Sequence, residues 1–182
     1  MTGQHRGMRV VALLRGVNLG GSRSLKMADL RAVVESLGHT DVETYLQSGN
    51  VVFTPKGRAS GDQIHAAIQD ATGLDTNVLI RTGEELAAVL ATNPYPVEDP
   101  TKVVVTFLAS AADAELTARF DAAAFAPEEL TVHGTEVYLY LPFGQGRSKL
   151  TQALAKLKTP GAASATTRNW RTVEALAAMT AE

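Results

Sequence analysis

Short apolar runs alternate with amphipathic stretches along the chain, and this pattern predicts a protein that mixes helices and strands. Residues 8–14 (MRVVALL) form a β-branched apolar run that is typical of a buried strand. A Gly-rich loop follows over residues 16–23, and the next amphipathic stretch predicts a helix from Ser24 to a stop signal at Gly38. Further strands are predicted at residues 42–47, 50–54 and 76–81, and further helices at residues 61–72 and 82–91.

Local signals mark where these elements begin and end. Ser24 and Asp62 stand where they can cap the helices that follow them. Ser48 and Gly49 form a two-residue hairpin signal between two predicted strands. Residues 82–85 (TGEE) have the form of a capping box, which predicts a helix start at this point.

The same order of elements restarts after a segment that suits neither a helix nor a central strand. Residues 92–101 (TNPYPVEDPT) contain Pro94, Pro96 and Pro100, and this proline content indicates a linker. After the linker, strands are predicted at residues 102–108, 130–133, 136–141 and 165–168, and helices at residues 111–124, 149–157 and 172–181.

The restart is also visible in the letters of the sequence. Residues 81–91 (RTGEELAAVLA) and 171–181 (RTVEALAAMTA) are identical at seven of eleven positions, at an offset of 90. The β-α-β-β-α-β order is that of the ferredoxin-like unit. We therefore predict an α+β fold of two tandem, internally duplicated ferredoxin-like β-α-β-β-α-β(-α) halves: a flexible tail at 1–7, a first half at 8–91, a Pro-rich linker at 92–101 and a second half at 102–182.

Composition narrows the range of functions. Of the 182 residues, 45% are hydrophobic and 20% charged, which is typical of a soluble globular protein. A net charge of −2 argues against general nucleic-acid binding, which needs a surplus of Lys and Arg. The absence of cysteine excludes disulfides and thiolate sites, and the four scattered histidines have no metal-ligand spacing, so no metal site is expected. No apolar stretch approaches the roughly 18 residues needed to span a bilayer, so we expect no membrane segment and a cytoplasmic protein.

Three segments together resemble a known family. LLRGVNLGGSRSLKMADLR, TYLQSGNVVF and TTRNWRTVEAL are similar to the bacterial family called domain of unknown function 1697 (DUF1697), and the resemblance spans about residues 8–180. The family carries no established activity or ligand, so the resemblance implies a fold class and the location of a site only. The positions characteristic of the family fall on Arg15, Gly16, Asn18, Gly20, Gly21, Lys26, Met27, Ser48, Gly49, Asn50, Arg168, Asn169, Trp170 and Thr172.

The predicted topology gathers polar and basic residues at two sheet edges. With strand order 4-1-3-2, the end of strand 1, the hairpin and the start of strand 4 share one edge of the first half. In the second half, the loop at residues 144–149 (GQGRSK) is expected to meet the end of strand 4, so that Arg147, Lys149, Arg168 and the indole of Trp170 are neighbours. The candidate ligand-binding residues are therefore Arg15, Asn18, Lys26, Ser48, Asn50, Lys149, Arg168, Asn169 and Trp170.

This mixture of cations, carboxamides, glycines and helix starts suits a phosphate or a carboxylate. The indole of Trp170 offers a face for a planar ring, which favours a small anionic, phosphorylated or nucleotide-like ligand. Two alternatives stay open. One is an RNA or single-stranded nucleic-acid binding module with exposed aromatics such as Phe53, Tyr138 and Tyr140 on its third strands. The other is a structural or protein-interaction domain without catalysis. The sequence leaves open whether any reaction is catalysed, which cofactor serves it, and the oligomeric state.

Several of the same residues also have a purely structural interpretation. The loop at residues 16–23 resembles a P-loop, but Ser22 stands where a P-loop has lysine, and its glycines also serve an irregular turn. Arg15 is either paired internally or directed at a ligand. A turn role for Ser48, a packing role for Trp170 and N-cap roles for Thr82 and Thr172 are the simplest interpretations of these residues.

Overall fold

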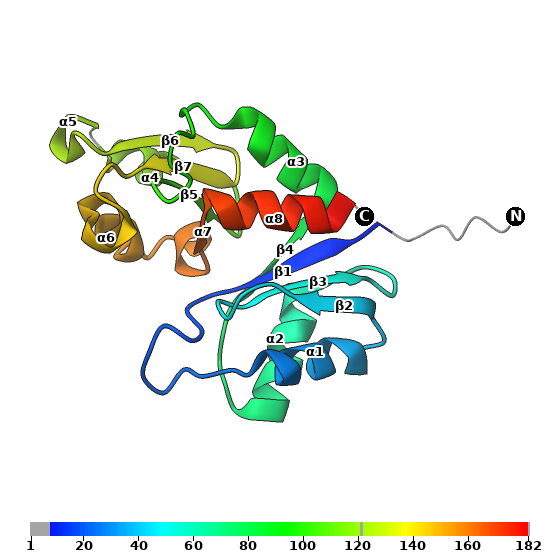
Figure 1. The fold of residues 1–182 in the computed structure, drawn as a ribbon. Coiled ribbons are helices and arrows are strands. Elements are labelled where there is room, and N and C mark those ends of the chain that lie inside the picture. Colours follow the sequence, from blue (N-terminus) through cyan, green and yellow to red (C-terminus); the bar gives the residue numbers. More distant parts are fainter. Residues whose placement is uncertain (1–7, 121, 182) are drawn as a thin grey trace, which may run out of the picture. The chain divides into compact units, whose positions relative to one another are not determined.

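The computed structural model describes residues 8–120 and 122–181 and shows an α+β chain with two four-stranded antiparallel sheets (Figure 1). The predicted tail at residues 1–7 lies outside the described residues. The chain divides into two compact units. Unit 1 comprises the described residues of Met1–Ala87 and Ala175–Glu182, and unit 2 is Ala88–Glu174.

Unit 1 contains the first sheet and two helices. Its elements are β1 (Val10–Leu14), α1 (Met27–Ser36), β2 (Thr40–Thr44), β3 (Asn50–Thr54), α2 (Gly61–Thr72) and β4 (Val78–Thr82). Unit 2 contains β5 (Val103–Phe107), α4 (Ala114–Ala118), α5 (Ala122–Phe125), β6 (Glu129–His133), β7 (Glu136–Tyr140), the 3-10 turn η1 (Gln145–Arg147), α6 (Lys149–Ala155), α7 (Pro160–Ala163) and β8 (Thr166–Asn169). Two helices, α3 (Gly83–Thr92) and α8 (Trp170–Ala181), each have residues in both units.

The two sheets have the same strand order. The first runs β2-β3-β1-β4 and the second β6-β7-β5-β8, and every pairing is antiparallel. In each unit the first strand therefore lies between the third and the fourth, which is the order that the sequence pattern predicts. This order places the end of β1 beside the start of β3 and the start of β4, with Leu13 opposite Asn50 and Leu14 opposite Val78.

Alternation along the strands separates two faces of each sheet. In unit 1, Val10, Ala12 and Leu14 pack with α1 and α2, and Figure 1 shows both helices on the same face of the sheet. Val11 and Leu13 point to the other face and are also fully buried. The apolar residues on the helix-covered face are Val10, Ala12, Leu14, Val51, Phe53 and Val78 from the strands and Leu30, Val34, Ile64 and Ile68 from the helices.

Unit 2 has a comparable core under its own helices. Val104, Val137 and Leu139 from the sheet pack with Leu150 and Leu154 of α6.

A β-carbon added at Gly61, at the start of α2 in unit 1, would collide with the carbonyl oxygen of Val78, so this glycine lets α2 pack close against β4. Among the described residues, no helix is long and apolar enough to cross a membrane.

Some predicted element ends are wrong, and tertiary contacts explain the differences. The helix predicted to start at Ser24 begins at Met27, because Leu25 is buried with its backbone N–H and carbonyl both bonded to Asn18. Lys26, in an extended conformation, takes the cap position without a side-chain hydrogen bond. Ser60, not Asp62, caps α2 by accepting from the backbone N–H of Gln63.

The turn between β2 and β3 is longer than the predicted two residues. The backbone N–H of Tyr45 donates to the carbonyl of Asn50 over 3.0 Å, so four residues, 46–49, make the connection. Leu46 and Gly49 both take positive φ there, at 56° and 84°. In unit 2, the helix predicted at residues 111–124 is two short helices, α4 and α5, and the first starts at the Asp113 side chain, which accepts from the N–H of Leu116.

The starts of α3 and α8 correspond at an offset of 87 rather than 90. The predicted capping box at Thr82 is confirmed, since its hydroxyl accepts from the N–H of Glu85 and its own N–H donates to the Glu85 carboxylate, over 3.1 and 2.7 Å. In α8 the equivalent cap is Asn169, whose side-chain oxygen accepts from the N–H of Thr172 over 2.9 Å. The predicted N-cap role of Thr172 is therefore wrong. Buried Leu86 and Val89 of α3 likewise correspond to buried Val173 and Leu176 of α8.

Candidate functional site

Three segments of unit 1 meet at the end of β1, and we call this region the loop edge. It consists of residues 15–26 after β1, the turn at residues 45–49 and residues 75–77 before β4. The N–H of Leu14 donates to the carbonyl of Gly49, and the N–H of Arg15 donates to the carbonyl of Asn77, over 2.9 and 3.0 Å. The structure therefore brings together the segments that the predicted topology places at one sheet edge.

Asn18 holds the loop edge together. Its side-chain N–H groups donate to the carbonyl oxygens of Leu25 and Gln47, over 2.8 and 2.6 Å, and its side-chain oxygen accepts from the N–H of Leu25 over 2.9 Å. Its φ of 55° is left-handed, which asparagine tolerates better than most residues. Because both ends of the carboxamide are bound to backbone, the side chain of Asn18 positions the two loops relative to each other.

Asn50 and Ser48 are part of the same framework. Asn50 is fully buried, and its side chain donates to the carbonyl of Tyr45 and to the hydroxyl of Ser48, over 2.8 and 3.0 Å. Gly49 takes φ of 84°, and a β-carbon there would lie 2.7 Å from side-chain carbons of Leu14 and Val17. The Ser-Gly-Asn segment therefore fits its role as a tight turn packed on the end of β1.

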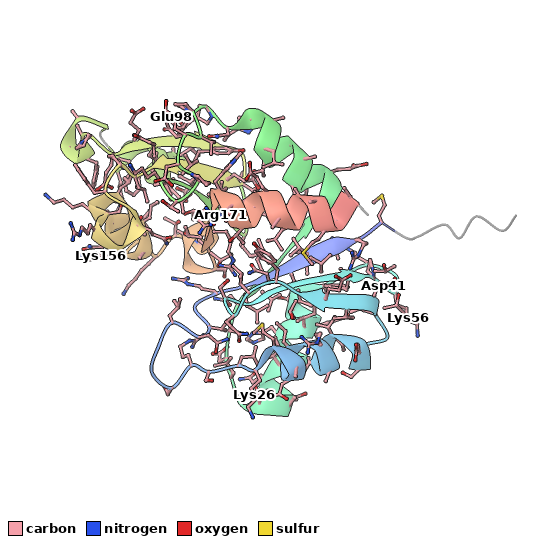
Figure 2. The ribbon with its side chains drawn as sticks, in the orientation of Figure 1. Lys26, Asp41, Lys56, Glu98, Lys156 and Arg171 are labelled. Carbon is pink, nitrogen blue, oxygen red and sulfur yellow. The ribbon has the colours of Figure 1, made fainter. Side chains whose placement is uncertain are left out.

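The cations of the loop edge are placed differently from these framework residues. Arg15 is half-buried, whereas Lys26 is exposed at the start of α1 and its side chain extends away from the ribbon in Figure 2. Arg23 spans the loop, because its guanidinium donates to the carbonyls of Gly16 and Asp75 over 3.1 and 2.8 Å. Residues 15–31 contain four Lys or Arg and one Asp, a local charge of +3 in a chain of net charge −2.

The second predicted cluster is not assembled. Arg168 lies opposite Val105 in the sheet, and Val105 is on the face away from the core that Val104 forms with Leu150 of α6. Arg168 is therefore on the other face from the side chains of Lys149 and α6, and the expectation that the two basic groups are neighbours is wrong. Its guanidinium donates to the Thr166 hydroxyl over 2.7 Å, and burial lowers the pKa of Arg168 to about 10.

The start of α6 is already occupied by a carboxylate of the protein. Glu128, only 8% exposed, accepts from the hydroxyl of Ser148 over 2.6 Å and from the N–H groups of Lys149 and Leu150 over 3.0 and 3.1 Å. These are the donors that the sequence analysis assigns to an external anion. The sequence does not reveal Glu128, because it lies twenty residues before its partner Ser148.

Trp170 and Asn169 also have internal roles. Trp170 is 4% exposed and donates from its indole N–H to the Glu174 carboxylate over 2.9 Å. The side-chain oxygen of Asn169 caps α8. Both residues therefore stabilise the junction of β8 and α8, and the indole offers no open face for a planar ligand.

The aromatic residues of the third strands are buried as well. Phe53 is fully buried, and Tyr138 is 1% exposed with its hydroxyl donating to the carbonyl of Val89 over 3.1 Å. Burial raises the pKa of Tyr138 to about 12. Tyr140 is half-buried beside a cavity. These strands lack the row of exposed rings that a single-strand-binding sheet uses.

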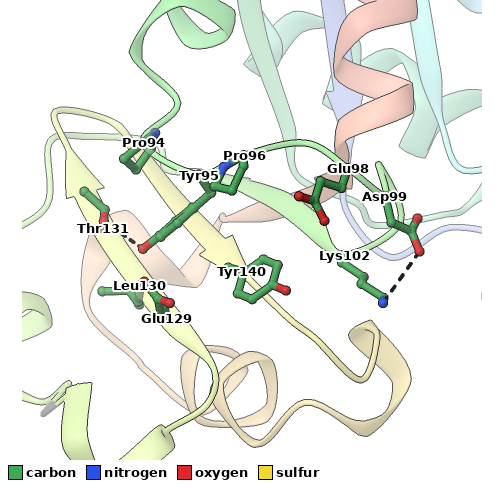
Figure 3. Close-up of a pocket in the computed structure, with 10 residues that line it drawn as sticks. All are labelled: Pro94, Tyr95, Pro96, Glu98, Asp99, Lys102, Glu129, Leu130, Thr131 and Tyr140. Atoms are coloured by element: carbon green, nitrogen blue, oxygen red, sulfur yellow. Dashed lines mark hydrogen bonds and ion pairs between the residues drawn. The ribbon is translucent and has the colours of Figure 1, made fainter.

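A cavity in unit 2 contains candidate functional residues that no sequence pattern indicates. It has a volume of about 700 Å³, and residues of the Pro-rich segment and the β6–β7 hairpin line it (Figure 3). Its lining residues are Pro94, Tyr95, Pro96, Glu98, Asp99, Lys102, Glu129, Leu130, Thr131 and Tyr140. Across residues 8–120 and 122–181, no group of three His, Cys, Asp or Glu side chains is arranged to hold a metal ion.

Comparisons with known proteins agree with this fold. A family model described as a protein of unknown function, DUF1697, matches residues 8–138, which confirms the resemblance seen in the sequence. No curated protein matches the chain. The structure of the conserved bacterial protein SP0830 from Streptococcus pneumoniae is similar, with 22% identity and a TM-score of 0.66, over 94% of this chain and 98% of that one. At this identity the similarity shows a shared fold.

Proposed function

Because the chain belongs to the DUF1697 family, whose function is unknown, we propose a function from its own geometry: the loop edge of unit 1 binds a small anionic, phosphorylated or nucleotide-like ligand. The observation that carries the proposal is the local charge of +3 over residues 15–31, which comprise the loop that Asn18 holds in place and the first residues of α1. A binding loop that is already ordered loses less conformational entropy when its ligand arrives.

The residue types at the loop edge suit a phosphate group. Lys26 supplies an exposed ammonium, and Arg15 a guanidinium, which matches phosphate oxygens in a bidentate manner. Gly20 and Gly21 are exposed, take φ of 100° and 78°, and have no atom near their missing β-carbons, so a ligand can approach their backbone closely. The start of α1 adjoins this loop and adds partial positive charge.

The proposed site is smaller than the set of candidate residues in the sequence. It uses Arg15 and Lys26 as ligand contacts and assigns Asn18, Ser48 and Asn50 to holding the loops. The remaining four candidates, Lys149, Arg168, Asn169 and Trp170, lie in unit 2 and are outside this site.

Titration calorimetry with pyrophosphate and with adenosine monophosphate tests the proposal. We expect Lys26→Gln and Arg15→Gln each to weaken binding roughly three- to tenfold, because each removes one charge from a partly screened contact. Affinity should also fall as salt rises. Lys56→Gln is the matched control, since Lys56 is exposed in unit 1 after the far end of β3.

Two results would contradict the proposal. One is equal loss of affinity in Lys56→Gln, which would indicate attraction by overall charge alone. The other is absence of binding by any phosphorylated compound at millimolar concentration while the protein remains folded.

We also propose that the chain consists of two ferredoxin-like halves, at 8–91 and 102–182, which arose by duplication and are joined by the linker at 92–101. The identical strand orders and the equivalent helix caps at Thr82 and Asn169 support this proposal. The cytoplasmic location expected from the sequence remains a prediction.

A further inference from the structure

The cavity of unit 2 has a different chemistry from the loop edge. We call it the tyrosine cavity, because Tyr95 and Tyr140 form two of its walls (Figure 3). Their ring centroids lie 6.2 Å apart with the ring planes inclined by 33°. Pro94, Pro96 and Leu130 add apolar surface. A volume of about 700 Å³ falls within the range of small-molecule sites.

Internal hydrogen bonds hold the Pro-rich wall of the cavity in place. The hydroxyl of Tyr95 is 2.7 Å from the hydroxyl of Thr131 on β6. Asn93 brackets the backbone of Tyr95, donating to its carbonyl and accepting from its N–H over 2.9 and 3.1 Å. Neighbouring prolines fix φ on both sides of Tyr95. The tyrosine cavity is therefore largely preformed.

The charges around the cavity are mostly negative. Glu98, Asp99 and Glu129 line it with one cation, Lys102, so the lining itself carries a net charge of −2. A second cation, Arg171, lies close enough to Asp99 to contribute to lowering the pKa of that carboxyl, after the larger effect of the Thr101 hydrogen bonds. Asp99 is engaged by Thr101, whose N–H and hydroxyl donate to it over 2.9 and 2.6 Å. Lys102 lies 3.9 Å from the same carboxylate, so the local cation is partly neutralised as well.

Glu98 and Glu129 supply the available negative charge. Within the described part of the chain, neither carboxylate makes a hydrogen bond or an ion pair. Both side chains are exposed, and in the view of Figure 3 the ring of Tyr140 lies between them. Burial raises the pKa of the Tyr95 phenol, and the nearby negative charge of Glu129 raises it further, while its hydrogen bond to Thr131 acts in the opposite direction.

We propose that the tyrosine cavity binds a small organic cation, an alkylammonium group attached to an apolar body. Aromatic faces attract cations through the ring quadrupole, and the attraction grows where the cation is partly desolvated. The carboxylates of Glu98 and Glu129 supply complementary charge, and the prolines with Leu130 contact the apolar body. The same net charge disfavours an anion, so this site is independent of the loop edge.

Binding of three probes that share a phenyl ring tests the charge preference. Benzyltrimethylammonium is the cation, benzyl alcohol the neutral compound and phenylacetate the anion, and titration is followed by calorimetry on the full chain. We expect the cation to bind at least tenfold more tightly than the neutral compound, and the anion not to bind. Equal binding of the cation and the neutral compound would overturn the proposal.

Substitutions locate the binding at the tyrosine cavity. Tyr140→Leu keeps apolar volume and removes the ring, so affinity for the cation should fall roughly three- to thirtyfold, whereas Tyr140→Phe should retain it. Glu129→Gln should weaken binding roughly two- to fivefold, because an exposed charge pair is lost. Glu84→Gln, an exposed carboxylate at the start of α3, and Lys26→Gln at the loop edge should leave binding unchanged.

Folding of the variants is checked by thermal unfolding. If Tyr140→Leu does not fold, the exposed position of Glu129 makes Glu129→Gln the deciding variant. Unchanged cation affinity in both Glu129→Gln and Glu98→Gln would place any binding elsewhere and contradict the proposal.

Discussion

At the scale of single residues, Glu128 shows that a helix start can resemble an anion-binding site although a carboxylate of the protein already occupies it. Three donors at the start of α6 converge on its carboxylate, and 8% of the residue is exposed. Such donors attract any oxyanion, whether it is a ligand or part of the chain. The GQGRSK segment therefore correctly indicates donors that bind an oxyanion, but it does not show that this oxyanion is the carboxylate of Glu128.

Glu128→Gln should lower the free energy of unfolding by about 2 kcal/mol, because the amide removes one acceptor from buried donors. Urea denaturation followed by circular dichroism measures the loss. Glu129→Gln is the control, since the neighbouring carboxylate is exposed and should change stability by less than about 0.5 kcal/mol. Equal stability of the two variants would mean that the Glu128 contacts contribute nothing net.

At the scale of elements, the sequence correctly predicts those helix starts that contacts between neighbouring residues determine. The capping box at Thr82 is correct because both partners lie within four residues of each other. The start of α1 is not predicted, because the side chain of Asn18 binds both backbone groups of the buried Leu25 before the helix begins. The strand order follows from the order of helices and strands along the chain. The face of the sheet on which the Arg168 side chain lies depends on the strand register, since a shift of one residue turns a side chain to the other face.

The offset of 87 between the starts of α3 and α8 makes Asn169 the structural counterpart of Thr82. Asn169→Ala should destabilise the protein by about 1 kcal/mol, as is usual for a lost N-cap. Thr172→Val keeps the side-chain shape inside the helix and should be close to neutral. If Thr172→Val were the more costly change in a urea titration, the offset of 90 given by the letters would describe the helix start better.

At the scale of the whole molecule, unit 1 is not a continuous stretch of chain. Its residues include Ala175–Glu182, and the guanidinium of Arg9 donates to the carbonyl of Met179 over 2.9 Å. Arg9, only 5% exposed, also donates to the carbonyl of Asp41 and pairs with Glu43, both over 2.8 Å. One buried guanidinium therefore links β1, β2 and the final turn of α8, a connection that no local sequence signal indicates.

Deleting residues 175–182 should destabilise unit 1 by roughly 1–3 kcal/mol, because the buried guanidinium of Arg9 loses an acceptor. Hydrogen exchange should then quicken in peptides from β1 and β2 more than in peptides from β6 and β7. Arg9→Gln in the full chain should reproduce part of this pattern. Unchanged exchange in β1 and β2 after the deletion would show that unit 1 is complete without these residues.

The distance along the chain between Arg9 and Met179 also has a consequence for synthesis. The two residues are 170 positions apart, and a ribosome adds about 5–20 residues per second, so roughly 10–30 s separate their appearance. During that interval β1 has emerged but its last contact has not, while all of unit 2 is being made. The unit that starts first is therefore the one that is finished last: its sheet is complete by Thr82, but it depends on its own core until translation reaches the end of α8.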